Sequence, residues 1–143
     1  NFTPLKADEL LKNIYNLISA SGVSFSYEIN PVEIIIHADG GQLEQVLINL
    51  IKNAWEAALH MNNPIVHIAV SLNEYQRPII TVTDNGSGIP EELLDKIFIP
   101  FFSTKQHGSG IGLSICRQII NAHGGTLTAT SDIDSGSTFT IKL

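Results

Sequence analysis

A β-branched run that ends in two glycine-rich clusters constrains this sequence more than any other feature. Residues 79–83 are isoleucine, threonine and valine only, which predicts a buried strand. The strand ends at Asp84, and Gly86 and Gly88 follow it in a loop where glycine permits φ > 0 and close backbone approach. Because a carboxylate can accept hydrogen bonds from an amine or a ring N–H, this loop suits a nucleobase.

The second glycine cluster, Gly108 to Gly112, lies directly before an apolar-periodic run that begins at Leu113. A glycine loop that opens onto a helix offers free N–H groups and a helix dipole, and both favour phosphate. No Gly-Lys-Ser/Thr ends the cluster, and its spacing is not that of the dinucleotide fingerprint. Taken alone, each of the two clusters could equally be a plain turn.

A helix is predicted over residues 42–58 from the spacing of its apolar residues. Its apolar face consists of Leu43, Val46, Leu47, Leu50, Ile51, Ala54 and Ala58. On the other side Asn49 and Asn53 lie one turn apart, although Asn is a poor residue inside a helix. An amide oxygen is a hard ligand suited to Mg²⁺, which prefers few protein ligands together with phosphates and water. The alternative is two solvated amides on a surface helix.

Four motifs in a fixed order resemble a known family. Asn-x-x-x-Asn on a helix, Asp-x-Gly-x-Gly after a strand, Phe-x-Pro-Phe-Phe (98–102) and Gly-x-Gly-x-Gly-Leu (108–113) are similar to the N, G1, F and G2 boxes of the histidine-kinase ATP-binding domain. That domain shares a wider fold with gyrase, MutL and the large heat-shock chaperones. The resemblance extends from about Pro4 to Leu143 and implies binding of ATP and Mg²⁺.

The resemblance also implies roles for individual residues. Asp84 would accept a hydrogen bond from the adenine amine, Asn53 would bind the metal, and Lys105 would contact phosphate. Asn49, Asn53 and Lys105 are the expected catalytic residues. The expected nucleotide-binding residues are Asn49, Asn53, Asp84, Gly86, Gly88, Ile89, Phe101, Thr104, Lys105, Gly108, Ser109, Gly110, Ile111, Gly112, Leu113 and Ser137.

The expected reaction is phosphoryl transfer to a histidine outside this chain. Gyrase-like and chaperone-like relatives carry a Glu one turn before the metal-binding Asn as a general base, whereas Asn49 is an amide and cannot act as a base. The histidines at 37, 60, 67, 107 and 123 all lack the family's phosphoacceptor pattern. We therefore expect a protein histidine kinase whose acceptor lies on an adjoining helical-hairpin dimerisation domain, with a response regulator downstream. The alternatives are a nucleotide-responsive interaction module and a serine kinase of the anti-sigma type.

Length and composition narrow the classes of protein to which the chain can belong. The 143 residues suit one domain, 1–143, and because the chain begins without Met we expect a piece of a longer kinase. A net charge of −6 argues against nucleic-acid binding, and no apolar run is long enough to cross a membrane. Cys116 is the single cysteine and suits a reducing compartment, so a cytoplasmic domain without membrane contact is expected.

Local patterns predict an α+β fold, a two-layer sandwich with a mixed, mostly antiparallel sheet of about five strands. Three main helices are expected on one face of the sheet. The first helix starts either at Thr3-Pro4 or near Ala7 and ends near Gly22. A short helix is expected over 90–97 and a longer one over 113–122. The expected strands are residues 23–29, 34–36, 65–72, 79–83, 126–131 and 137–143.

Overall fold

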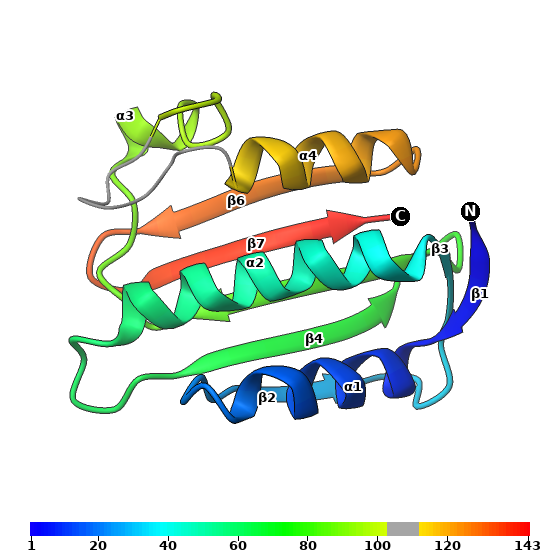
Figure 1. The fold of residues 1–143 in the computed structure, drawn as a ribbon. Helices are drawn as coiled ribbons and strands as arrows, with labels where there is room; N and C mark the ends of the chain where they lie inside the picture. The colour runs from blue at the N-terminus through cyan, green and yellow to red at the C-terminus, as the bar shows by residue number, and fades with distance from the viewer. Residues whose placement is uncertain (103–111) are drawn as a thin grey trace.

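A five-stranded sheet forms one layer of the molecule (Figure 1). The computed structural model describes residues 1–102 and 112–143. The strands lie in the order β2, β4, β5, β7, β6; only β2 and β4 are parallel, and the other neighbours are antiparallel. Their bounds are β2 (Ser26–Ile29), β4 (Val66–Leu72), β5 (Pro78–Asp84), β6 (Thr126–Asp132) and β7 (Gly136–Lys142). The predicted mixed, mostly antiparallel sheet is confirmed.

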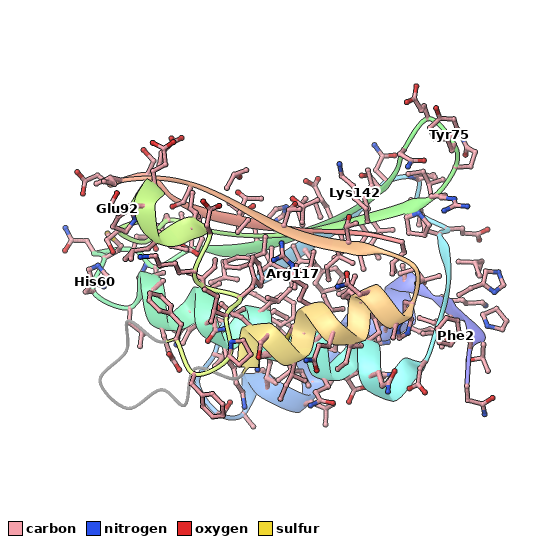
Figure 2. All side chains as sticks on the ribbon, turned by 90° about the horizontal axis from the view of Figure 1, so that it is seen from above. Phe2, His60, Tyr75, Glu92, Arg117 and Lys142 are labelled. Atoms are coloured by element: carbon pink, nitrogen blue, oxygen red, sulfur yellow. The ribbon has the colours of Figure 1, made fainter. Side chains whose placement is uncertain are left out.

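Three helices cover one face of this sheet and form the second layer (Figures 1 and 2). They are α1 (Ala7–Ser19), α2 (Gly40–Ala58) and α4 (Gly112–Ala122), and the short α3 (Glu91–Leu94) contacts β6. The predicted α+β sandwich is therefore confirmed. None of the helices described in 1–102 and 112–143 is long and apolar enough to span a bilayer.

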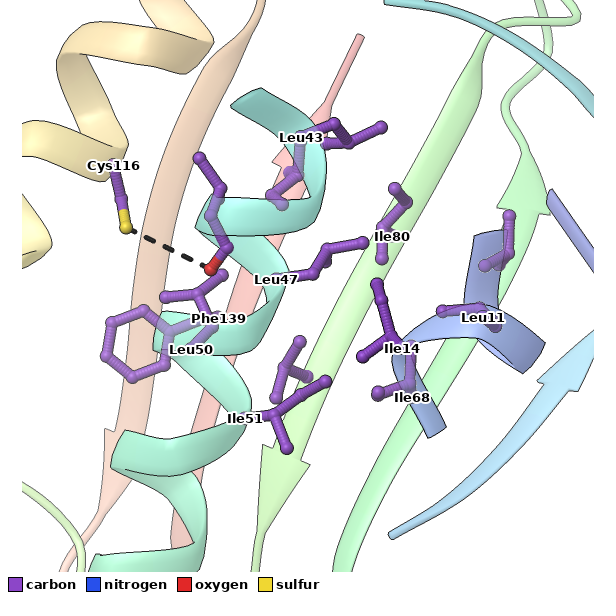
Figure 3. Close-up of a cluster of buried hydrophobic side chains, with 14 of the residues drawn as sticks. Leu11, Ile14, Leu43, Leu47, Leu50, Ile51, Ile68, Ile80, Cys116 and Phe139 are labelled. Atoms are coloured by element: carbon purple, nitrogen blue, oxygen red, sulfur yellow. Dashed lines mark hydrogen bonds between the residues drawn. The ribbon is translucent and has the colours of Figure 1, made fainter. Parts of the chain in front are cut away.

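The core lies between the helices and the sheet, with α2 at its centre (Figure 3). Leu43, Leu47, Leu50 and Ile51 of α2 are fully buried, as the apolar periodicity of this helix predicted. Burial of one such side chain contributes roughly 1.5–3 kcal/mol relative to exposure, so this one helix stabilises the fold strongly. The thiol of Cys116 on α4 lies 3.9 Å from the carbonyl oxygen of Val46, which joins α4 to α2.

Residues 3–6 do not begin a helix, so the expected start at Thr3-Pro4 is wrong. They form β1 (Thr3–Lys6), which pairs antiparallel with β3 (Ile35–Ala38) in a separate two-stranded sheet. Proline disfavours the helical region for the residue before it, and this favours an extended Thr3. The helix instead begins at Ala7, the other start that the sequence allowed, with acidic residues in its first turn.

Other boundaries also differ from expectation. The strand expected from Val23 begins at Ser26, and the helix expected through Ile97 ends at Leu94. Residues 30–34 separate two strands that do not pair with each other, since β2 pairs with β4 whereas β3 pairs with β1. These differences concern the ends of elements and the pairing of strands, because both depend on contacts with residues that are distant in sequence.

One end of the helical layer is held by His123, after α4. Its Nε2 accepts a hydrogen bond from the backbone N–H of Asp39 at 3.1 Å, and its Nδ1 donates to the Ile119 carbonyl at 2.8 Å. Phe2 stacks on the same ring, with the centroids 4.3 Å apart. Asp39 is the N-cap of α2 and accepts from the Gln42 N–H at 3.0 Å. The start of the chain, α2 and α4 thus meet at this end.

Candidate functional site

The two glycine segments meet the same helix two turns apart. A Cβ atom at Gly86 would overlap the backbone carbonyl of Ala57, and one at Gly112 would lie 2.8 Å from Nδ2 of Asn49. Asn53 lies midway between Asn49 and Ala57 on α2, at a spacing of four residues that puts all three on one face. The chain therefore places two segments of the predicted site on either side of Asn53.

The amide of Asn53 is oriented by its neighbour on the helix. Nδ2 of Asn53 donates to Oδ1 of Asn49 at 3.0 Å, and both residues are partly buried. This bond distinguishes the two ends of the Asn53 amide, so the oxygen is the atom that a cation would use. An amide oxygen fits Mg²⁺ as a hard ligand, with phosphate oxygens and water as the remaining ligands.

Asp84 is a buried carboxylate at the end of β5, with only 4% of its surface exposed. Its Oδ1 accepts a hydrogen bond from the Gly86 N–H at 2.8 Å. Burial raises the pKa of the Asp84 carboxyl above its ordinary value of 3.8, and hydrogen bonds from the backbone of Gly86 and Ser137 oppose this rise. Few acidic residues are buried without a strong reason, so Asp84 is the outstanding polar group at this edge of the sheet.

The loop after Asp84 requires both of its glycines, for different reasons. Gly88 has φ +82°, and a Cβ there would overlap the carbonyl oxygen of Asp132. Gly86 has no positive φ but packs directly against Ala57 of α2. The expectation of close approach thus holds at both positions, and that of φ > 0 holds at Gly88 alone.

Asn85, between Asp84 and Gly86, joins the loop to the segment that follows α2. Its Oδ1 accepts from the Ile65 N–H at 2.8 Å, and its Nδ2 donates to the Asn63 carbonyl at 2.8 Å. Its own backbone N–H donates to the Ile65 carbonyl at 3.2 Å. The backbone at Asp84 is therefore anchored on both sides, by β5 and by these three bonds.

The aromatic cluster at 98–102 divides into an inner and an outer part. Phe98 is buried, makes an edge contact with Phe139 at 6.2 Å, and lies 3.9 Å below the guanidinium carbon of Arg117. Phe101 is 80% exposed with a left-handed backbone, φ +68°. Phe98 therefore anchors this segment to the core, whereas the ring of Phe101 is open to solvent.

The other predicted residues divide by where they fall in the chain. Ile89 and Leu113 are partly buried against the core, and Ser137 is buried with its Oγ 3.0 Å from Oγ of Ser131. The remaining ones lie outside the described residues: Thr104, Lys105, Gly108, Ser109, Gly110 and Ile111.

A small polar hollow lies beside Asp84 and includes residues that the sequence did not single out. It is lined by Thr83, Asp84, Thr130, Ser131, Asp132, Ser135, Gly136, Ser137 and Thr138. Asp134 to Gly136 lie between the predicted strands 126–131 and 137–143, and Ser131 is predicted only as a strand residue. A signal was available at Gly136, because a glycine at a strand start often marks a close backbone approach.

Comparison with known proteins identifies the family of the chain. A family model described as Histidine kinase-, DNA gyrase B-, and HSP90-like ATPase matches residues 38–143. Sporulation kinase C of Bacillus subtilis is 35% identical over 147 residues, covering 99% of this chain and 34% of the relative. The chain therefore spans about a third of the length of that kinase.

Among solved structures, the nucleotide-free catalytic domain of the histidine kinase ThkA superposes with a TM-score of 0.87. It is 35% identical, and the match covers 100% of this chain and 95% of that domain. ThkA has also been solved in complex with the response regulator protein TrrA, and there the match covers 99% of this chain and 41% of ThkA at 34% identity and a TM-score of 0.82. Sequence and fold agree: the chain belongs to the family of histidine kinase-, DNA gyrase B- and HSP90-like ATPases.

Proposed function

We propose that this domain binds Mg-ATP and donates the γ-phosphoryl group to a histidine on an adjoining helical-hairpin domain, as the catalytic domain of a protein histidine kinase. The observation that carries the proposal is the convergence of both glycine segments on α2 around Asn53, next to the buried Asp84. Family membership supports it, because the relatives that match this chain are kinases.

Asp84 is the proposed determinant for adenine. A buried carboxylate that accepts an N–H from the 6-amino group would favour adenine over guanine, which has a carbonyl there. The absence of side chains at Gly86 and Gly88 keeps the loop close to the sheet and to α2. Ile89 and Ser137, which adjoin this loop, complete the proposed adenine side.

The proposed phosphate side is formed by α2 and the start of α4. Asn53 would bind Mg²⁺ and Asn49 a phosphate or a metal-bound water, while Lys105, Thr104 and residues 108–113 would contact phosphate at the beginning of α4. When bound, Mg²⁺ supplies charge neutralisation of the phosphates. The chain's own residues position the nucleotide, and because Asn49 cannot act as a base, transfer is favoured over hydrolysis.

The proposed partners follow from the relatives. Since the chain covers about a third of sporulation kinase C, we assign the phosphoacceptor histidine to another domain of a longer kinase. A response regulator is the proposed downstream partner, as the ThkA–TrrA complex suggests for this fold. We place the reaction in the cytoplasm, where ATP is available.

Titration calorimetry of ATP, with and without Mg²⁺, tests the binding step. We expect a Kd between micromolar and millimolar, about −4 to −8 kcal/mol, tighter with Mg²⁺ than without, and weaker binding of GTP. Asp84→Asn should abolish binding, whereas Asp39→Asn, the same exchange at the far end of α2, should leave it unchanged. Failure of the unmodified domain to bind ATP would refute the proposal.

A second experiment tests transfer. The domain is incubated with γ-labelled ATP and a phosphoacceptor hairpin from a related histidine kinase, and acid-labile, base-stable label on the hairpin is measured. Label on histidine that requires Asn53 supports the kinase proposal. Nucleotide binding without label on any hairpin tested would favour a nucleotide-responsive interaction module instead.

A further inference from the structure

The hairpin of β6 and β7 holds the glycine loop that follows Asp84. The backbone N–H of Ile89 donates to Oγ of Ser131 at 2.6 Å, and the N–H of Asp134 donates to the Ser87 carbonyl at 2.8 Å. Gly88 packs directly against the carbonyl of Asp132. Every residue from Ser87 to Ile89 thus contacts this hairpin, although the two segments are more than forty positions apart in sequence.

Ser131 is the centre of these contacts. Besides the bond from Ile89, its Oγ lies 3.0 Å from the Gly136 carbonyl and 3.0 Å from Oγ of Ser137. A hydroxyl has one proton and two lone pairs. Its proton goes to the Gly136 carbonyl, so the lone pairs accept from the Ile89 N–H and the Ser137 hydroxyl. One side chain thereby uses its full hydrogen-bonding capacity on the loop and on the start of β7.

The start of β7 in turn contacts Asp84. Gly136 has φ +101°, and a Cβ at this position would overlap the backbone carbonyl of Asp84. The backbone of Ser137 donates a hydrogen bond to the Asp84 carboxylate. Ser131 therefore connects Ile89, at the end of the loop after Asp84, with Ser137, whose backbone bonds the Asp84 carboxylate.

We propose that Ser131 is a positioning residue for adenine recognition: its hydroxyl fixes the glycine loop and the start of β7 so that the Asp84 carboxylate is held in one place. Ser131 acts through Asp84 and touches no reacting group. The inference rests on the proposed binding of ATP. It predicts that loss of the hydroxyl impairs discrimination by Asp84 and leaves contacts to phosphate intact.

The test compares ATP with inosine triphosphate, which carries a carbonyl in place of the 6-amino group. Calorimetric affinities for both are measured with the unmodified domain, Ser131→Ala, Ser131→Cys and Ser131→Thr. Thr128→Ala, an exposed hydroxyl on the same strand, is the matched control. Thermal unfolding without nucleotide is recorded for each variant.

Ser131→Ala and Ser131→Cys should weaken ATP binding about tenfold, which corresponds to about 1.4 kcal/mol, and change binding of inosine triphosphate little. Ser131→Thr keeps the oxygen and should retain the preference for ATP, as should Thr128→Ala. Ser131→Cys conserves volume, so it supplies the answer if Ser131→Ala does not fold.

The inference is overturned if the unmodified domain prefers ATP and Ser131→Cys keeps that preference. It is also overturned if both affinities fall equally, because that pattern indicates general destabilisation. If the unmodified domain binds neither nucleotide, the proposed function itself fails, and the two failures are thus distinguishable.

Discussion

Asp84 combines a charge with burial, and this has a measurable effect on stability. Its pKa is raised above 3.8 in the folded state, mainly by desolvation. Between 3.8 and the raised pKa the folded state therefore binds more protons than the unfolded chain, so stability falls as pH rises. The destabilisation is absent below 3.8 and complete above the raised pKa.

Asp84→Asn removes this titration. Relative to the unmodified domain, the variant should gain stability as pH rises from about 4 to 7, measured by urea unfolding without nucleotide. Asp39 provides a control of opposite sign: the hydrogen bond from the Gln42 N–H lowers its pKa, so its contribution is present above 3.8 and lost at lower pH. Asp39→Asn should accordingly lose relative stability as pH rises. Equal slopes for the two variants would contradict the assignment.

The thiol of Cys116 should be inert in the folded protein. It is 2% exposed, and burial raises its pKa to about 12, so almost no thiolate is present at neutral pH. We expect alkylation by iodoacetamide at pH 8 to be at least a hundredfold slower than in 6 M guanidinium chloride, as measured by mass spectrometry. Rapid labelling under native conditions would show that α4 separates from α2.

Two glycine-to-alanine substitutions distinguish the free-energy cost of a left-handed backbone conformation from that of a steric clash. Gly22 and Gly136 both have positive φ, but a Cβ at Gly22 meets nothing within 4 Å, whereas one at Gly136 overlaps the Asp84 carbonyl. Gly22→Ala should cost about 1 kcal/mol of unfolding free energy and Gly136→Ala about 3 kcal/mol or more. Chemical denaturation measures both, and similar costs would mean that β7 shifts freely away from Asp84.

At the residue scale, the sequence singles out the residues that we propose carry chemistry, but not the residue that we propose supports them. Asp84, Asn49, Asn53 and both loop glycines could be found because each is unusual for its local element. Ser131 could not be found in this way, because a serine is an ordinary residue in an alternating strand. Its partners, Ile89 and Gly136, come together only through the sheet. The local pattern contains no trace of that contact.

At the scale of elements, Arg117 of α4 contacts both β6 and the segment that follows α3. Its Nε and Nη2 donate to the Leu127 carbonyl at 3.1 and 3.0 Å, and its guanidinium covers the ring of Phe98. Figure 2 shows Arg117 between α4 and the sheet. β6 is the edge strand of its sheet and has no neighbouring strand on its outer side. Arg117 therefore supplies the Leu127 carbonyl with hydrogen-bond donors at an edge where no further strand provides them.

Arg117→Ala should therefore lower the unfolding free energy by about 2 kcal/mol, through two hydrogen bonds and a cation–π contact. Arg117→Lys keeps the charge but not the planar fork and should lose about half as much. Gln118→Ala, exposed on the same helix, should change stability by less than about 0.5 kcal/mol. Urea unfolding curves give all three values, and a neutral Arg117→Ala would assign Phe98 alone as the anchor.

Helices and strands were predicted correctly where the hydrophobic pattern of the element alone identifies it. The amphipathic period of α2 and the β-branched run of β5 can be recognised without knowing their partners. The pairing of β1 with β3 could not, because Thr3–Lys6 is short, contains a proline and is specified by contacts 29 to 35 residues away. The expected helix start at Thr3-Pro4 failed for the same reason.

At the scale of the whole molecule, nucleotide binding should raise stability by mass action. At an ATP concentration of a hundred times Kd with Mg²⁺ present, the gain is about 2.7 kcal/mol. For a domain of this size we expect a rise in Tm on the order of 8 °C. Differential scanning fluorimetry measures it, and Asp84→Asn should show no rise. A shift of equal size in that variant would place the nucleotide elsewhere.

The fold class could be predicted from the order of four motifs, whereas the relative placement of those motifs could not. Nothing in the sequence says that Gly86 meets Ala57 while Gly112 meets Asn49. That placement depends on how α2 lies across the sheet, which is decided by packing of its apolar face.

The stacking of Phe2 on His123 has a geometric consequence for any acceptor joined to this domain. Both chain ends lie at the His123 end of the molecule, away from Asp84 at the other (Figure 1). Asn53, on the proposed phosphate side, lies 13 residues along α2 from Gly40 at this end, which is about 20 Å. A tether from residue 1 needs about six extended residues to cover that length. A domain fused there through a shorter rigid connection would be held out of reach of the proposed phosphate site, so we expect connection length to control transfer within one chain.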